Sequence, residues 1–234
     1  MDIRLLIFDL DGTLVDSRKD LVLSVNATRA HLGLPPLDED TVSSYVGNGA
    51  PVLIQRALGP GFAEDQSAAA LRFFLAYYRE HKLDHTGFYP GVREALDMFG
   101  ERTLAVLTNK PVRISREMLE ELGVAARFRY VYGGNSFENK KPHPEGVLSI
   151  LADSRIPPAQ AMMVGDSDVD VVTGRNAGIH CCGVSYGFKP HTFQQTPPDI
   201  LVHNLVELAA LLNKNGRLPG ADKHKQHNRS IKPG

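Results

Sequence analysis

Short, unbroken aliphatic runs, each ending in polar or glycine residues, recur along this 234-residue chain and constrain its fold more than any other feature. An unbroken apolar run is typical of a strand buried on both faces, as in a parallel sheet covered by helices. The candidate strands are residues 4–8, 103–107, 130–132, 161–164, 181–186 and 200–202. Candidate helices lie between several of them, at residues 91–99, 113–122, 144–152 and 169–177. This alternation predicts an α/β fold with an open parallel sheet, in which ligands bind at the carboxyl ends of the strands.

One long interval, from residue 17 to residue 85, contains no convincing strand. Apolar residues at helical spacing predict helices there instead, over residues 21–32, 40–45, 52–58 and 64–81. We therefore expect an all-helical subdomain, the cap (residues 17–85), inserted into an α/β core made of residues 1–16 and 86–212. Residues 213–234 are polar, basic and without periodicity, which predicts a flexible tail.

Charge and hydropathy exclude several classes of protein. The 26 Lys and Arg residues nearly balance the 27 Asp and Glu residues, whereas a nucleic-acid-binding domain is usually strongly basic. Residues 214–232 nevertheless hold six Lys and Arg against one Asp, so the rest of the chain has a net charge of −6. No apolar stretch approaches the roughly 18 residues of a membrane helix, and the amino-terminal apolar run is too short for a signal peptide. We expect a cytoplasmic protein with no nucleic-acid or membrane partner, and the oligomeric state stays open.

Asp9 and Asp11 form the strongest local motif, in the segment FDLDGTLVDS at residues 8–17. Residues two apart on an extended chain project to the same side, so both carboxylates can face one site. Gly12 allows the sharp turn that ends the strand. Two carboxylates at a strand end suit an ionised nucleophile and a protonated acid. The alternatives are a solvated acidic turn and a calcium loop, although the glycine comes too early for the latter.

A second acidic segment, VGDSDVD at residues 164–170, follows another predicted strand. If this strand lies beside the first, Asp166 and Asp170 approach Asp9 and Asp11. Carboxylates at such close quarters repel one another unless a cation intervenes. Oxygen-rich ligands with room for water and phosphate favour Mg²⁺, so these four aspartates form the candidate metal site.

Three further residues offer groups suited to phosphate. Thr108 and Asn109 end another predicted strand, and their hydroxyl and amide can bind phosphate oxygens without adding charge. Lys141 supplies a cation in the segment KKPHP, where the following proline stiffens the backbone. A lone lysine is more often a surface residue, which is our expectation for Lys140.

These separate motifs occur in the order and spacing of the haloacid dehalogenase (HAD) superfamily, and the resemblance covers residues 3 to about 212. It implies a Rossmann-like, HAD-like core with an inserted helical cap. It also implies that Asp9 attacks phosphorus to form an aspartyl-phosphate, and that Asp11 protonates the leaving group and then activates water. Mg²⁺ would be held by Asp9, the backbone carbonyl of Asp11 and Asp166, supported by Asp170. The phosphoryl oxygens would be bound by Thr108, Asn109 and the catalytic cation Lys141.

The resemblance also narrows the chemistry within the superfamily. The founding dehalogenases lack the second aspartate of the first motif, so Asp11 argues against carbon–halogen cleavage. Phosphonatases need a cap lysine, and none occurs between Lys19 and Lys82. A phosphomonoester hydrolase acting on a small phosphorylated metabolite fits best.

Residues 45–50 and 56–58 resemble the cap of the phosphoglycolate-phosphatase-like branch. Gly47, Asn48 and Gly49 precede a helix beginning near Pro51, whose first N–H groups could receive an anion. We expect this loop, with help from Arg56, to recognise a substrate carboxylate. A simple turn, and for Arg56 a solvated helix face, remain the alternatives.

The leading expectation is therefore Mg²⁺-dependent hydrolysis of 2-phosphoglycolate to glycolate and phosphate. A broader sugar-phosphate or pyrophosphate hydrolase and a β-phosphoglucomutase-like phosphotransferase stay open as alternatives. A non-enzymatic metal- or phosphate-binding regulator fits less well, because binding alone does not need Asp11.

Overall fold

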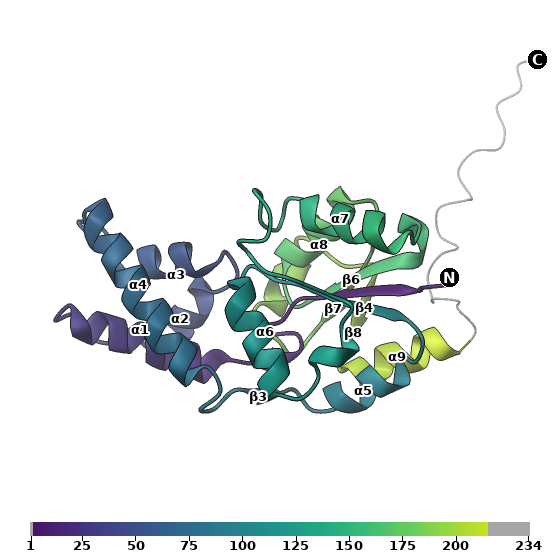
Figure 1. Cartoon of the computed structure of the whole chain (residues 1–234), viewed down its shortest axis with the longest axis horizontal. Coiled ribbons are helices and arrows are strands. Elements are labelled where there is room, and N and C mark those ends of the chain that lie inside the picture. The colour runs from purple at the N-terminus through teal and green to yellow at the C-terminus, as the bar shows by residue number, and fades with distance from the viewer. Residues whose placement is uncertain (1, 215–234) are drawn as a thin grey trace, which may run out of the picture.

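A six-stranded parallel sheet forms the centre of the computed structural model, which describes residues 2–214 (Figure 1). The strand order is β5–β4–β1–β6–β7–β8. The strands are β1 (Leu5–Phe8), β4 (Thr103–Leu107), β5 (Tyr130–Tyr132), β6 (Ala161–Gly165), β7 (His180–Val184) and β8 (Ile200–Val202). The predicted α/β fold with an open parallel sheet is confirmed, and every predicted strand is present.

Strand β1 lies in the middle of this sheet, between β4 and β6. All of its residues are buried, because helices cover both faces of the sheet (Figure 1). Leu6 and Phe8 pack into the larger apolar cluster on one face, and Leu5 and Ile7 pack into the smaller cluster on the other. This burial on both faces explains why the strand reads as an unbroken apolar run.

Two helical layers complete the core. Helices α5 (Val92–Met98), α6 (Val112–Glu121) and α9 (Leu205–Asn213) contribute to the larger apolar cluster. Helix α7 (Glu145–Ser154) contributes to the smaller cluster, and α8 (Asp168–Asn176) packs beside β6 and β7. Because β1, β4 and β6 are parallel neighbours, their carboxyl ends meet at one edge of the sheet.

Four helices lie within the predicted cap, at the left in Figure 1. They are α1 (Arg18–His31), α2 (Glu39–Tyr45), α3 (Ala50–Leu58) and α4 (Glu64–His81). The chain passes between core and cap twice, and the two passing segments pair with each other. They form a short antiparallel ribbon of β2 (Val15–Asp16) and β3 (Gly87–Phe88). The buried carboxylate of Asp20 accepts hydrogen bonds from the backbone N–H groups of His85 and Thr86, at 2.9 and 2.8 Å. The proposed domain limits stay a prediction.

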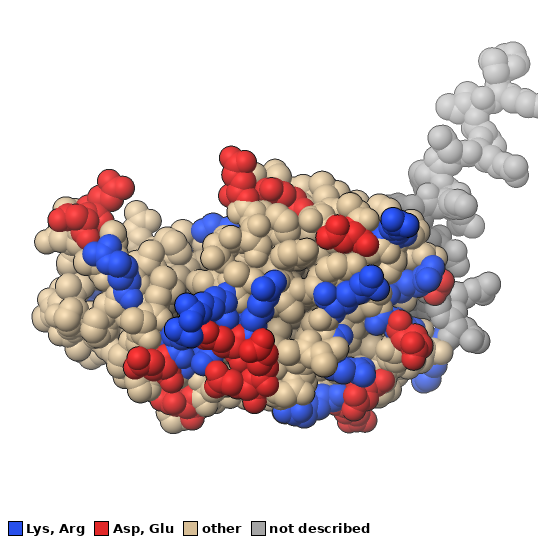
Figure 2. Space-filling model, viewed as in Figure 1, with Lys and Arg blue, Asp and Glu red and all other residues tan. Residues whose placement is uncertain are grey.

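Acidic and basic side chains are intermixed on the face in Figure 2, with a dense group over α6. There the Glu117 carboxylate accepts hydrogen bonds from Arg79 of α4, at 2.6 Å, and from Arg113, at 3.1 Å. The bonds from Arg79 hold the pKa of Glu117 at about 2. An exposed ion pair therefore links cap and core.

The predicted tail, residues 213–234, lies outside the described residues from residue 215 onward. Asn213 is the last residue of α9, and its Oδ1 accepts a hydrogen bond from Arg102 at 2.9 Å. Over residues 2–214, the structure contains no helix with the length and hydropathy needed to cross a membrane.

Candidate active site

Asp9 directly follows β1 and stands at the meeting point of the strand ends. The chain then turns sharply at Gly12, which has a φ of +80°. A β-carbon at Gly12 would collide with the carboxylate of Asp166. Only glycine allows both this left-handed conformation and such a close approach of the backbone.

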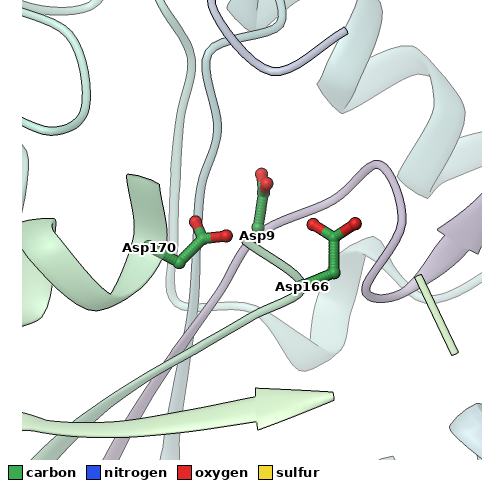
Figure 3. Close-up of side chains that lie close together, drawn as sticks. All are labelled: Asp9, Asp166 and Asp170. Carbon is green, nitrogen blue, oxygen red and sulfur yellow. The ribbon is translucent and has the colours of Figure 1, made fainter. Parts of the chain in front are cut away.

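Three carboxylates converge at this edge, from Asp9, Asp166 and Asp170 (Figure 3). Asp166 follows β6, and Asp170 lies in the first turn of α8. Each side chain offers an oxygen that lies within 4.8 Å of the other two. The predicted approach of the two acidic segments is therefore found in the structure.

Burial and mutual repulsion disfavour the ionised forms of Asp9 and Asp166. Burial raises the pKa of Asp166 to about 8, and the charges of Asp170 and Asp9 add to the effect. Burial also raises the pKa of Asp9, to about 6, although Lys141 opposes it. A hard divalent cation would offset this repulsion, so the three-carboxylate donor set fits Mg²⁺.

Lys141 reaches the same cluster from the loop before α7. Its Nζ donates to Asp170 Oδ1 at 2.7 Å and lies 3.0 Å from Asp9 Oδ1. Burial lowers the pKa of Lys141, but the charges of Asp170 and Asp9 outweigh that effect and raise it. Lys141 is therefore a cation held beside Asp9.

Asp11 lies apart from the three clustered carboxylates. Its Oδ1 accepts a hydrogen bond from Ser17 Oγ at 2.5 Å and lies 2.9 Å from the Nζ of the buried Lys110. Lys110 Nζ in turn donates to the hydroxyl of Tyr78, at 2.7 Å, which comes from α4. The acid predicted from the first motif thus connects to the cap through Lys110.

Thr108 and Asn109, at the end of β4, are buried beside the cluster. The Asn109 side chain is occupied by the protein itself: its Nδ2 donates to the carbonyls of Gly47, at 2.8 Å, and Lys141, at 3.0 Å. Its Oδ1 accepts from the backbone N–H of Lys141 at 3.1 Å. The Asn109 amide therefore holds the cap loop and the Lys141 loop together, and direct phosphate binding would compete with these bonds.

The predicted specificity residues of the cap divide into two groups. Gly47 and Gly49 line the cavity between cap and core, whereas Asn48 and Arg56 are absent from its lining. The guanidinium of Arg56 donates to Asn48 Oδ1 at 3.2 Å and to the Tyr45 carbonyl at 3.5 Å, so it braces the loop from outside. Helix α3 begins at Ala50 with a proline in its first turn, as the sequence predicts.

The cavity is lined by polar and charged residues of the core and by mostly apolar residues of the cap. Its lining includes the core residues Asp9, Asp11, Thr108, Asn109, Lys110, Asp166, Ser167, Phe188 and Lys189. The cap contributes Leu21, Val46, Gly47, Gly49, Ala50, Leu53, Phe74, Leu75 and Tyr78. A small polar substrate would lie between the carboxylate cluster and an apolar cap.

The cavity is also lined by two lysines and a tyrosine that the sequence did not predict as site residues: Lys110, Lys189 and Tyr78. Lys110 did carry a signal, because it directly follows Thr108 and Asn109 at the same strand end. Tyr78 and Lys189 carried no sequence signal, since a tyrosine in an amphipathic helix and a lysine in a loop are both common. Lys189 follows Phe188, whose backbone N–H donates to Asp166 Oδ2 at 2.5 Å.

Comparison with known proteins agrees with this geometry. The family model for haloacid dehalogenase-like hydrolases matches residues 6–184, which is most of the chain. The chain belongs to this family. The HAD hydrolase is 39% identical over 224 residues to a phosphoglycolate phosphatase of Chromobacterium violaceum, covering 92% of this chain and 98% of that protein. It is 37% identical over 214 residues to phosphoglycolate phosphatase 1 of Pseudomonas aeruginosa, covering 88% and 78%.

Solved structures of HAD hydrolases have the same fold as this chain. A crystal structure of a predicted phosphoglycolate phosphatase from Haemophilus somnus superposes with a TM-score of 0.85 and 33% identity. The match covers 90% of this chain and 98% of that one. The membership of the HAD superfamily that the sequence motifs predict is therefore confirmed.

Proposed function

We propose that this HAD hydrolase is a Mg²⁺-dependent phosphatase that converts 2-phosphoglycolate and water into glycolate and phosphate. The observation that carries the proposal is Asp9 beside Lys141 within a three-carboxylate cluster, facing a cavity under the cap. The names of the relatives support the choice of substrate. We further propose that residues 17–85 act as the cap over this site.

The first step transfers the phosphoryl group to the protein. A carboxylate oxygen of Asp9 attacks phosphorus, and the bond between phosphorus and the glycolate oxygen breaks. Asp11, two residues along the chain, gives its proton to the departing oxygen. Ser17 and Lys110 hold the Asp11 side chain in place for this transfer.

The second step returns Asp9 to its starting state. Asp11, now ionised, accepts a proton from a water molecule, and that water attacks the phosphorus of the aspartyl-phosphate. The bond between phosphorus and the Asp9 oxygen breaks, and phosphate leaves. One residue thus acts as acid and then as base.

Charge compensation accompanies both steps. Lys141 and the Thr108 hydroxyl bind phosphoryl oxygens and stabilise the charge of the transition state. Asp9, the Asp11 carbonyl and Asp166 would hold Mg²⁺, with Asp170 orienting Lys141 and supporting the site. The bound ion supplies positive charge that neutralises the phosphoryl group.

The cap is proposed to select the substrate. Backbone N–H groups around Gly47 and Gly49, at the start of α3, are suited to a carboxylate. Asn48 and Arg56 contribute indirectly, because Arg56 braces the loop. The hydrogen bond from Asn109 to the Gly47 carbonyl holds this loop against the core.

The test is turnover of the Asp9→Asn variant with a panel containing 2-phosphoglycolate, a sugar phosphate and pyrophosphate. We expect 2-phosphoglycolate to be the best substrate of the wild-type enzyme. In Asp9→Asn we expect kcat to fall at least about 10³-fold, because the amide is not a nucleophile. Acid quenching should trap a phosphorylated wild-type protein and an unmodified variant. Asp16→Asn is the matched control, since Asp16 is exposed and its carboxylate bonds only locally.

Retention of more than about a tenth of the activity by Asp9→Asn would overturn the nucleophile assignment. Faster turnover of the sugar phosphate or pyrophosphate would instead overturn the substrate while leaving the mechanism in place.

A further inference from the structure

Three lysines with side chains at the active site differ in how their charge is balanced. Lys141 lies between Asp9 and Asp170, and Lys110 pairs with Asp11. Lys189 also lines the cavity, yet none of the ion pairs among residues 2–214 includes it. Its charge is therefore available to a ligand.

The backbone holds Lys189 at the boundary between core and cap. It follows β7 and precedes a short 3₁₀ turn, and its N–H donates to Asp166 Oδ2 at 3.3 Å. Its side chain extends to the cap loop, since a β-carbon on Gly47 would lie 3.8 Å from Lys189 Nζ. The ammonium group thus lies beside the loop proposed to select the substrate.

The surroundings of Lys189 favour an added anion. The residue is half-buried, and neighbouring cavity surface from Val46, Leu53 and Phe188 is apolar. Burial and the nearby charge of Arg56 lower the pKa of Lys189, while Asp166 and Asp168 act in the opposite direction. A partly desolvated cation without a paired carboxylate is stabilised more by an anionic ligand than a cation that already has such a partner.

We propose that Lys189 is a specificity-determining residue whose ammonium group binds the carboxylate of the substrate across the boundary between core and cap. This inference rests on the proposed function, because it assigns the second anionic group of the same substrate. The phosphoryl group lies at Asp9 and Lys141, and the carboxylate lies between Lys189 and the N–H groups at the start of α3. Two parts of the chain far apart in sequence thereby select a small phosphorylated acid.

The test compares 2-phosphoglycolate with 2-hydroxyethyl phosphate, a neutral-ended ester of nearly the same size. Lys189→Met removes the charge and keeps much of the side-chain volume. We expect it to lower kcat/KM for 2-phosphoglycolate about 10- to 100-fold, as for loss of a charged hydrogen bond. We expect kcat/KM for 2-hydroxyethyl phosphate to change less than about threefold, because that substrate has no carboxylate. Lys189→Arg should restore part of the preference.

Lys140→Met is the matched control, since Lys140 lies near the same cap loop but does not line this cavity. It should leave the ratio of the two kcat/KM values unchanged. Equal losses on both substrates in Lys189→Met, or no loss on either, would overturn the role of Lys189. Failure of the proposed function is distinguishable, because the wild-type enzyme itself would then show no preference for 2-phosphoglycolate.

Discussion

Gly12, Gly165 and Gly187 surround the acidic cluster, and each leaves no room for a β-carbon. A β-carbon at Gly12 or Gly187 would collide with Asp166, and one at Gly165 would collide with Asp170. The backbone therefore packs directly against the carboxylates and fixes their positions. Residues with no functional group of their own position the charged ones.

Metal binding at the cluster of Asp9, Asp166 and Asp170 can be measured through the thermal stability of the protein. Mg²⁺ should raise the melting temperature of the wild-type protein, because it binds the folded cluster and offsets the repulsion there. At a concentration 100 times Kd the gain is about 2.7 kcal/mol. In Asp166→Asn the shift should largely disappear, since one of three clustered carboxylates is lost. Differential scanning calorimetry with Mg²⁺ or EDTA measures it.

Asp168→Asn serves as the control, because Asp168 is not one of the three clustered carboxylates. An equal Mg²⁺ shift in Asp166→Asn and wild type would show that the ion binds elsewhere.

Local motifs made part of the candidate site predictable from the sequence. Asp9 and Asp11 sit two residues apart after a clear strand, so ten residues of sequence suffice to predict them as site residues. Lys110 directly follows Thr108 and Asn109, but its pairing with Asp11 joins residues far apart in the chain. Lys189 has no such neighbours, and its contact with the cap loop is also long-range. Sequence patterns of short range do not report such pairs.

Helices α4 and α6 are connected by the ion pair between Arg79 and Glu117. The folded pKa of Glu117, about 2, lies below the value of about 4.5 expected in the unfolded chain. Its stabilising effect is therefore complete above pH 4.5 and is lost as the pH falls toward 2. Glu117→Gln should lower the melting temperature at pH 7 by a few degrees at most, because the pair is exposed, and by less at pH 3.

Thermal unfolding at both pH values measures this difference, with Glu120→Gln, on the same helix, as the control. A difference between Glu117→Gln and wild type that stays constant from pH 7 to pH 3 would contradict the ion pair.

Element length decided what could be predicted of the fold. The strands of the sheet and the helix at residues 64–81 have clear periodicity or apolar runs, and they were found. Strands β2 and β3 have two residues each, too few to show any pattern. Helix α9 was not predicted, although Leu205, Leu208 and Leu212 are buried along one face of it.

Charge is distributed unevenly along the chain. The basic residues after Asn213 nearly cancel a net charge of −6 in the rest of the chain. Truncation after Asn213 should leave kcat/KM within about twofold of wild type, because every proposed site residue lies between Asp9 and Lys189. The same truncation should increase retention on an anion exchanger.

Steady-state kinetics and chromatography of the full-length and truncated proteins check both expectations. A large loss of kcat/KM with an unchanged melting temperature would assign the segment a part in catalysis.

The central position of β1 has a consequence for how the protein is made. Strand β1, which directly precedes the proposed nucleophile Asp9, is synthesised well before the two strands that flank it, which begin at Thr103 and Ala161. The helices of residues 18–81 contact one another and are all made before β4, whereas β1 must wait for β4 and β6 before it can pair on both sides. The growing chain thus carries an unpaired apolar strand during synthesis, and the proposed catalytic centre assembles only after β6 and α8 have been made.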